Sequence, residues 1–432
     1  MTDMKVRGAK VTGVSRLTQW ISLLFAALIP NIKQAIKQAI KQVVGFRAAP
    51  RRVRSPLTIA AITMLTLGVL NSSLTAFSQS NPTPVDSSTT GQTYEVESTP
   101  DHVIWGELFK PDSEPILTVK SGDLVALETI SHEGILADQG DTVEFLTGQG
   151  IDSEDILPDQ LEVKANVEKT GPGPHVITGP IYVEDAEPGD VLEIKTVKID
   201  YRVPYGVISN RHGKGALPGE FPVDEADIYT KVIPIDMAQN IGIFRPSNEA
   251  PAIGIPLKPF MGIMGVVPAD VAESVNSIPP GVYGGNVDIK RLGVGSSLYL
   301  PVQVPGALFY SGDPHCAQGN GEVALTAIEC SLTPTFELVL HKDMALEQPM
   351  GETSESWISV GLDEDLNEAM KESVRESLRI VNSEYGLTEQ DALLLGSAAI
   401  DFEVSQVVDI VKGVHGVISK ELFEPMEQEQ PL

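Results

Sequence analysis

Short apolar runs separated by glycine, proline and acidic residues fill most of the chain after residue 100, a pattern that predicts β-strands joined by turns. Residues 116–120 and 124–129 are two such runs, joined by Ser121-Gly122-Asp123. Residues 178–194 read as a hairpin whose Pro188-Gly189-Asp190 turn is solvated. Further strands are expected at residues 298–309, 322–330 and 335–341.

The pattern changes after Gly361. Apolar residues then recur every four positions with charged residues between them, which predicts an amphipathic helix over residues 363–383. Thr388 opens a helix-capping signal before a second helix over 389–400. The expected fold is therefore mostly β (α+β), with a β-sandwich or barrel-like core and a smaller C-terminal helical part.

The first 78 residues have a different pattern. An apolar run over residues 57–70 follows four arginines and ends in small residues, which is typical of a secretory signal. The run is shorter than the roughly 20 residues of a membrane span, and an uncleaved anchor is the alternative. We therefore expect an exported protein, periplasmic or extracellular, with a signal peptide or anchor over 55–78, a linker over 79–100 and one large domain over 101–420.

Residues 1–54 form a basic, amphipathic N-terminal extension with 11 lysines and arginines and one acidic residue. Within residues 31–42, isoleucine and lysine each recur every four positions, so a helix would carry an apolar stripe beside a basic one. Such a helix suits an anionic membrane surface, and membrane contact is expected only through this N-terminal segment. The alternative is upstream sequence translated from a mis-assigned start codon.

The rest of the chain is strongly acidic. It holds 20 basic and 58 acidic residues, a net charge of −38 against −28 for the whole chain. A surface of this charge repels nucleic acid at long range, so no nucleic-acid partner is expected. Neutral or cationic small molecules are the favoured partners.

Residues 311–322 hold the densest set of reactive side chains in the chain. These are Asp313, His315, Cys316, Gln318 and Glu322. Glycines and Pro314 stand between them and favour an irregular backbone, so we interpret the segment as a shaped loop that carries metal ligands and proton-transfer groups. Asp313 and His315 are two positions apart and would face the same side of an extended segment, within reach of one cation. The alternative is a polar turn between two strands.

Three other features are candidates for function. Cys316 and Cys330 are the only cysteines and would permit one disulfide in an exported protein, although spacing alone does not establish it. A packing role for Cys316 is favoured over a catalytic thiol. His132-Glu133 follows the 124–129 strand as a functional pair or a surface turn, and residues 211–215 form a basic loop that either edges a pocket or is solvated.

Several motifs, taken together, resemble the acetamidase/formamidase family. They are residues 178–190, 284–289 and 312–322, with shorter matches at 117–123 and 406–409, in order along about 102–420. The resemblance implies a β-rich fold, hydrolysis of short linear amides of the formamide or acetamide type to a carboxylate and ammonia, a divalent metal, and a homodimer or higher homo-oligomer. Zinc is the first choice of metal and calcium the second. Asp185 and Asn320 depart from the expected Gly and Asp, and the exported N-terminus leaves the amide substrate open.

If the chain hydrolyses amides, each candidate residue has an expected role. The metal ligands are Asp288, Asp313 and His315, because histidine and carboxylates are suitable ligands for zinc-like ions. Glu322 is the general base and acid that moves a proton from water to the leaving nitrogen, with His132 as a further ligand or acid. Asn286 or Gln318 would donate to the developing oxyanion. Two alternatives are an amidase that uses Cys316 as its nucleophile and a non-enzymatic, cation-holding β-rich module of the cell envelope.

Overall fold

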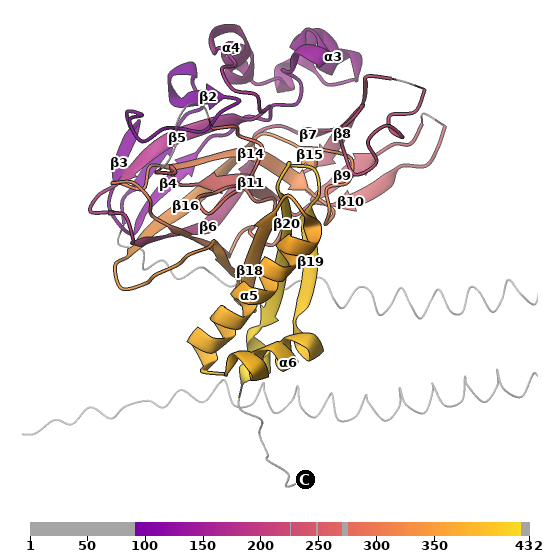
Figure 1. Cartoon of the computed structure of the whole chain (residues 1–432). Helices are drawn as coiled ribbons and strands as arrows, with labels where there is room; N and C mark the ends of the chain where they lie inside the picture. The colour runs from indigo at the N-terminus through magenta and orange to yellow at the C-terminus, as the bar shows by residue number, and fades with distance from the viewer. Residues whose placement is uncertain (1–90, 225, 248, 270–274, 425–432) are drawn as a thin grey trace, which may run out of the picture. The chain divides into compact units, whose positions relative to one another are not determined.

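The computed structural model describes residues 91–424 apart from 225, 248 and 270–274 (Figure 1). The expected N-terminal extension, the signal peptide and most of the linker lie outside these residues. Among the residues that are described, no helix is both long and apolar enough to cross a membrane. Strand β1, Thr93–Val96, falls inside the expected linker and pairs in parallel with β4, Asp123–Leu127, so regular structure begins before residue 101.

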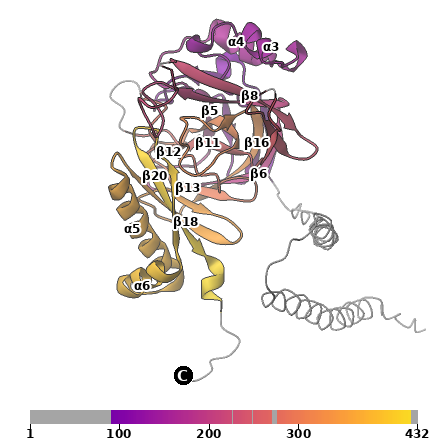
Figure 2. The same cartoon turned by 90° about the vertical axis from the view of Figure 1, so that its right-hand side faces the viewer.

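Two large β-sheets contain the strands that the structure describes, which confirms the mostly β class (Figure 2). Within these residues the first sheet has nine strands in the order β1-β4-β16-β6-β13-β17-β18-β20-β19. The second has eleven, with the path β10-β9-β8-β7-β15-β14-β11-β12; off this path β5 pairs with β14, and β2 and β3 pair with β5. The remaining strands are β2 (Val103–Trp105), β3 (Leu117–Val119), β5 (Val176–Val183), β6 (Val191–Tyr201), β7 (Tyr205–Arg211), β8 (Ile228–Asp236), β9 (Ile241–Phe244), β10 (Ile253–Pro256), β11 (Phe260–Gly265), β12 (Gly284–Asn286), β13 (Ser297–Pro301), β14 (Phe309–Ala317), β15 (Ile328–Glu329), β16 (Leu332–His341), β17 (Met350–Glu352), β18 (Ser356–Asp363), β19 (Asp401–Gln406) and β20 (Lys412–Ser419).

The main hydrophobic core lies between the two sheets. It joins buried side chains of β4, β6, β13 and β16 to others of β5, β11 and β14, namely Val125, Leu192, Leu300, Phe336, Ile181, Met264 and Phe309. The rings of Phe309 and Phe336 meet edge to face with centroids 5.3 Å apart. The sheets therefore pack face to face, as in a β-sandwich.

The expected hairpin over residues 178–194 is wrong. β5 pairs with β14, β2 and β3 in one sheet, whereas β6 pairs with β13 and β16 in the other. Similarly, the strands expected at 116–120 and 124–129 exist as β3 and β4 but lie in different sheets. Because β5 and the first half of β6 are buried on both faces, neither has the polar face that would mark a local hairpin.

The expected loop over residues 311–322 is half strand. β14 is buried through Cys316 and contains Pro314, a residue that normally interrupts a central strand. Pro314 is tolerated here because β14 changes partner around it, from β5 at Gly312 to β15 at His315. On this edge no strand residue is the register partner of Pro314, and its carbonyl accepts from Cys330 N at 2.9 Å; on the other edge its register partner is Met261 of β11. The strand expected over 322–330 is shorter than expected, because only the two residues of β15 are strand.

The two helices expected near the C-terminus are confirmed. They are α5, Leu366–Tyr385, and α6, Glu389–Ala399. Asp365 caps α5 by accepting from the backbone N–H groups of Asn367 and Glu368, and α5 packs on β18 and β20. Two short helices at the other end of the domain in Figures 1 and 2, α3 (Thr142–Gly148) and α4 (Pro158–Asn166), have too little apolar periodicity to be predicted. The 3₁₀ turns are Pro100–His102, Ala137–Gln139, Ser153–Asp155 and Lys420–Phe423.

Candidate active site

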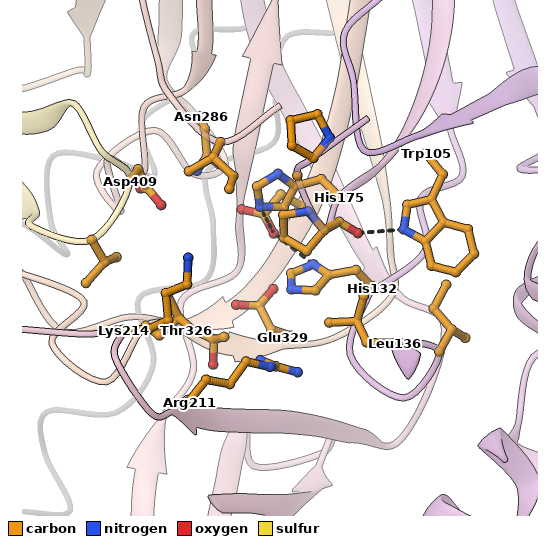
Figure 3. Close-up of a pocket in the computed structure, with 18 of the residues that line it drawn as sticks. Trp105, His132, Leu136, His175, Arg211, Lys214, Asn286, Thr326, Glu329 and Asp409 are labelled. Atoms are coloured by element: carbon orange, nitrogen blue, oxygen red, sulfur yellow. Dashed lines mark hydrogen bonds and ion pairs between the residues drawn. The ribbon is translucent and has the colours of Figure 1, made fainter. Parts of the chain in front are cut away.

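A cavity of about 640 Å³ opens where strand ends and loops of the second sheet meet (Figure 3). Figure 3 shows His132, His175 and Glu329 facing a common space, with Trp105 on one side and Asp409 on the other. These residues come from segments far apart in the sequence, and all of them line the cavity. Only the fold brings them together.

Strands β14 and β15 form the floor of the cavity. Asp313 and His315 point to the same side of β14, as their spacing predicts, and His315 Nε2 lies 3.1 Å from Asp313 Oδ2. His315 is also the register partner of Glu329 on β15, and Nε2 lies 3.1 Å from Glu329 Oε1. On its other side His315 Nδ1 lies 3.6 Å from Asp288 Oδ1. All four side chains are at most 3% exposed.

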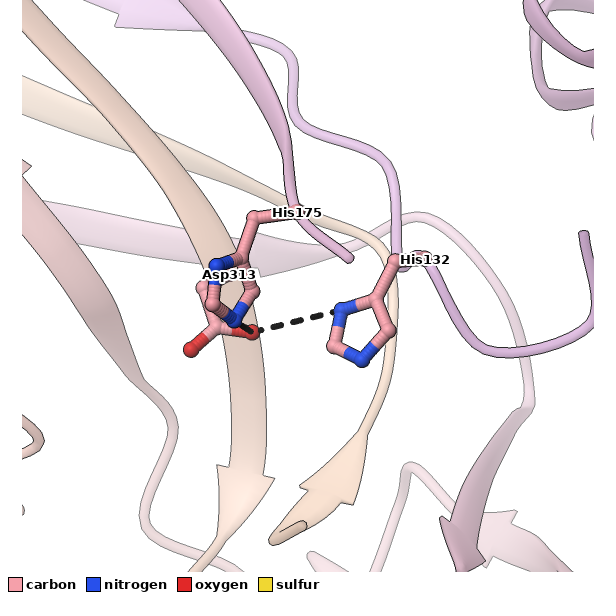
Figure 4. Close-up of side chains that lie close together, drawn as sticks. All are labelled: His132, His175 and Asp313. Atoms are coloured by element: carbon pink, nitrogen blue, oxygen red, sulfur yellow. Dashed lines mark ion pairs between the residues drawn. The ribbon is translucent and has the colours of Figure 1, made fainter. Parts of the chain in front are cut away.

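A second cluster shares Asp313 with the first (Figure 4). His132 Nδ1 and His175 Nε2 lie 3.5 Å and 3.7 Å from Asp313 Oδ1, and the two rings meet edge to face. The orientation of His175 is fixed by a contact between its Nδ1 and Ser277 Oγ at 3.0 Å. Three nitrogen and oxygen donors therefore converge on one point.

Three carboxylates form a third cluster. Ligand atoms of Asp288, Glu322 and Asp409 lie within 4.8 Å of one another, and all three residues line the cavity. Asp288, Asp313 and Glu322 adopt φ values of 49°, 53° and 45°, in the left-handed region that side chains disfavour. Strained backbone of this kind persists where the surrounding structure imposes it, and it concentrates at functional sites.

The pKa values of these groups are strongly perturbed. Burial raises the pKa of Asp288 to about 6 and that of Glu329 to about 7. Burial and neighbouring carboxylates raise the pKa values of Glu322 and Asp409 well above the usual range. Asp313 differs: burial alone would raise its pKa, but His315 and His175 hold it well below its usual range. The site therefore gathers more acidic groups than it can ionise without added positive charge.

The residues present fit a divalent cation. Several buried atoms that face the cluster make no hydrogen bond, although buried polar atoms normally have one, and the histidine nitrogens among them meet carboxylate oxygens only as ion pairs at 3.1 to 4.0 Å. They are His132 Nδ1, Asp288 Oδ1, Asp313 Oδ1, His315 Nδ1 and Nε2, Glu329 Oε2 and Asp409 Oδ2. Gly262 on β11 keeps the space beside them open, because a Cβ there would lie 2.5 Å from Asp288 Oδ1 and 2.9 Å from His315 Cε1.

The predicted site residues are mostly found together. Asp288, Asp313, His315, Glu322 and His132 form the clusters, and Asn286 lines the cavity. Gln318 does not line it: its amide nitrogen donates to the backbone carbonyls of Asp288 and Ser405 at 3.0 Å and 3.2 Å. Gln318 therefore ties loops together and has no free donor for an oxyanion.

Four further residues of the site were not predicted: His175, Gly262, Glu329 and Asp409. Asp409 stands inside the 406–409 motif that signalled the family, so that resemblance was the available signal, whereas His175 precedes the 178–190 motif and had no such signal. Glu329 had none, because only the pairing of β15 with β14 brings it to His315.

The basic loop over 211–215 lies at the edge of the cavity, which Arg211 and Lys214 line. Of the two interpretations of this loop, the pocket edge is therefore confirmed. Arg211 donates to the buried Glu133 at 2.6 Å and to Asp138 at 2.6 Å. Glu133 is thereby fixed next to His132, whose Nε2 lies 3.7 Å from Glu133 Oε1. The His132-Glu133 pair is a buried part of the site wall and not a surface turn.

The hypothesis of a cysteine nucleophile is wrong. Cys316 and Cys330 form a disulfide, with Cα atoms 5.8 Å apart, and the described residues contain no free cysteine. Cys316 belongs to the core between the sheets, on the opposite side of β14 from His315.

Comparisons with known proteins agree with this fold. The model of the acetamidase/formamidase family matches residues 99–277 and 270–425. A formamidase of Methylophilus methylotrophus is 25% identical over 314 residues, which span 58% of this chain and 77% of the relative. A solved structure from Thermoanaerobacter tengcongensis, described as a predicted acetamidase/formamidase, has a TM-score of 0.62 and 27% identity over 78% of this chain and 98% of its own. An acetamidase of Bacillus halodurans has a TM-score of 0.60 and 27% identity over 77% and 98%.

The fold and the family match place the chain among β-rich hydrolases. The chain belongs to the acetamidase/formamidase family and is an amidohydrolase.

Proposed function

We propose that this chain hydrolyses the C–N bond of linear amides at the floor of the cavity, releasing ammonia and a carboxylate. The observation that carries the proposal is the convergence on the cavity floor of buried nitrogen and oxygen atoms that make no hydrogen bond. A site built only for stability would join these atoms by hydrogen bonds, because a buried polar atom without a hydrogen bond costs free energy.

The same atoms would hold a divalent cation. His132, His175 and Asp313 form a mixed nitrogen and oxygen set that suits zinc, whereas Asp288, Glu322 and Asp409 form an all-oxygen set that suits calcium. When bound, such a cation polarises an amide carbonyl and makes water acidic near neutral pH. Zinc at the histidine set is our first choice, and calcium at the oxygen set is the alternative.

Glu322 is the proposed proton carrier. It lies on the cavity wall and its carboxylate reaches to 4.0 Å from His315 Nε2. As a carboxylate it takes a proton from the attacking water, and as a carboxylic acid it delivers that proton to the leaving nitrogen. The raised pKa of Glu322, caused first by burial, favours the acid form that the second transfer needs.

The carbonyl oxygen needs a donor as it becomes an oxyanion. Asn286 supplies one from β12, since it is buried and lines the cavity. Asp313 stays ionised and keeps the imidazoles of His132, His175 and His315 turned towards the floor. Glu133 and Arg211 support His132 from behind.

The test is ammonia release from formamide, acetamide and longer linear amides by protein stripped with a chelator and reloaded with zinc or calcium. Glu322→Gln should lower kcat by about a hundredfold or more at unchanged metal content. Glu193→Gln is the matched control, because Glu193 is also a buried glutamate but lies on β6 away from the cavity. Bound metal without ammonia from any amide would contradict the hydrolase and favour the cation-holding module. Full activity of Glu322→Gln would reject the assigned proton carrier.

We also propose export from the cytoplasm. The Cys316–Cys330 disulfide supports it, because structural disulfides persist mainly in oxidising compartments. Mass spectrometry of the protein purified from its cellular fraction would test both the compartment and the removal of the signal peptide.

A further inference from the structure

The cavity is much larger than a short amide. A water molecule takes roughly 30 Å³ of liquid, so acetamide, with four heavy atoms, fills only on the order of 100 Å³. The cavity measures about 640 Å³, within the range that larger ligands fill. Most of it therefore lies beyond the amide group that the floor would hold.

The upper wall of the cavity is partly apolar. Trp105, Leu136, Leu325 and Ile410 line it, and the indole of Trp105 is fixed by a hydrogen bond to Pro174 O at 2.8 Å. Leu325 and Ile410 have φ values of 116° and 68°, which are rare for bulky side chains. These side chains offer a surface for several methylene groups.

Basic residues line the same cavity, and not all are neutralised. Arg211 is paired with Glu133 and Asp138. Lys164 and Lys169 donate to neutral backbone and hydroxyl oxygens, as at Thr142 Oγ1 and Gly171 O. The ammonium group of Lys214 has no hydrogen bond or ion pair with any residue that the structure describes, and in Figure 3 it points into the cavity.

The turn that carries Lys214 is joined to the segment that follows the proposed proton carrier. The turn comes after β7 and is docked on the segment after Glu322: Ala216 N donates to Val323 O at 2.9 Å, and Asn210 Nδ2 donates to Ala324 O at 2.7 Å. The backbone of this turn is thus a fixed part of the cavity rim, and the exposed side chain of Lys214 projects from it.

We propose that the substrate is an amide that also carries a carboxylate several carbons away, and that Lys214 is the residue that selects it. The proposal rests on the amide hydrolysis proposed above. The amide would lie on the floor, the methylene chain along the apolar wall and the carboxylate at the rim. Because residues after 54 carry a net charge of −38, an anionic substrate is repelled at long range, and it needs local cations to enter. Monoamides of dicarboxylic acids have this chemistry.

The test compares adipamic acid with hexanamide, two linear amides with six carbons that differ in one terminal carboxylate. Metal-loaded wild-type enzyme should show the higher kcat/KM with adipamic acid. Lys214→Met should lower the ratio of the two kcat/KM values roughly three- to tenfold, and Lys214→Glu should lower it further. Lys198→Glu, at an exposed lysine of β6 outside the cavity, is the matched control and should leave the ratio unchanged.

The failures of the two proposals are distinguishable. The inference is overturned if wild-type enzyme prefers hexanamide. It is also overturned if Lys214→Glu leaves the ratio of the two kcat/KM values unchanged. In either case the proposed amide hydrolysis stands. If neither amide releases ammonia, the proposed function fails, and calorimetric titration of both compounds into metal-loaded protein decides the inference. Tighter binding of adipamic acid that Lys214→Glu abolishes supports it, and equal binding of both compounds overturns it.

Discussion

Two halves of the site are held in place by different means. Asp313, His315 and Glu329 lie on β14 and β15, and we call them the strand-borne group. Asp288, Glu322 and Asp409 lie on loops, and we call them the loop-borne group. Both groups are buried and face the same floor, so the comparison isolates how each is positioned.

The strand-borne group is fixed by a ladder and a covalent bond. His315 and Glu329 are register partners, and the Cys316–Cys330 disulfide joins the next residue of each strand. On the other edge His315 pairs with Phe260 of β11, whose ring meets the imidazole edge to face at 5.0 Å. These side chains therefore have little freedom to move.

The loop-borne group depends on hydrogen bonds between distant segments. Gln318 ties the 318–322 loop to the carbonyl of Asp288, and Gly321 N donates to Ser405 O at 2.9 Å. Glu403 on β19 joins three segments, because it accepts from Arg291 and from Asn320 and lies 3.3 Å from His415 Nε2. The two halves should therefore respond differently to mutation: the strand-borne half through stability, the loop-borne half through activity.

The largest effect is expected at the junction of the two groups. Gly262→Ala places a Cβ against Asp313 Oδ2 of one group and 2.5 Å from Asp288 Oδ1 of the other. Displacing both carboxylates should lower kcat/KM about a hundredfold or more and reduce bound metal. Gly254→Ala, on the exposed edge strand β10, is the control and should keep both. Normal activity of Gly262→Ala would show that the floor needs no space there.

The same division explains what could be predicted from the sequence. Asp313 and His315 share a face because they are two residues apart in a strand, which holds whatever the fold is. Helix α5 follows from its own period and caps. Glu329 and Gly262 become site residues only through β-pairing, and the partner change at Pro314 has no local signal. Gln318 looked like a substrate donor because its bonds to Asp288 and Ser405 join segments that the sequence does not align.

The next effect is expected at Glu403. Glu403→Gln removes the charge that holds Arg291 and the 318–322 loop, so we expect roughly tenfold lower kcat/KM with a melting temperature within about 2 °C of wild type. Asn320→Asp should act in the same direction, because it sets a second carboxylate against Glu403. Asp401→Asn, an exposed acid of the same strand, is the control. Unchanged activity in both variants would end the claim that Glu403 positions the loop-borne group.

A smaller effect on activity is expected from the disulfide. Replacing Cys316 and Cys330 by alanine opens a link between residues 14 apart, which should lower the free energy of unfolding by about 3 kcal/mol. The ladder still aligns His315 with Glu329, so kcat/KM of the folded enzyme at 25 °C should stay within about twofold. Urea unfolding and ammonia release measure the two quantities. A large loss of activity at an unchanged free energy of unfolding would contradict the expectation that mutations of the strand-borne half act through stability.

The smallest effect on activity is expected at His415, which should change how the free energy of unfolding depends on pH. His415 is fully buried beside Ser405, and burial lowers its pKa to about 4 despite the nearby carboxylate of Glu403. In the unfolded chain the histidine takes up a proton below about pH 6.5, whereas in the folded protein it stays neutral until about pH 4. Stability is therefore lost as the pH falls through this window, by at most about 3 kcal/mol.

His415→Gln isolates this contribution, because His175, whose pKa burial also lowers to about 4, is present in both proteins and cancels in the difference. The free energy of unfolding of wild type minus that of the variant should fall between pH 7 and pH 4, measured by urea titration of metal-free protein. A difference that is constant with pH would mean that His415 titrates alike in both states. Because the carbonyl of Ser405 also accepts from Gly321 and Gln318, a falling difference would tie acid sensitivity to the scaffold of the loop-borne group.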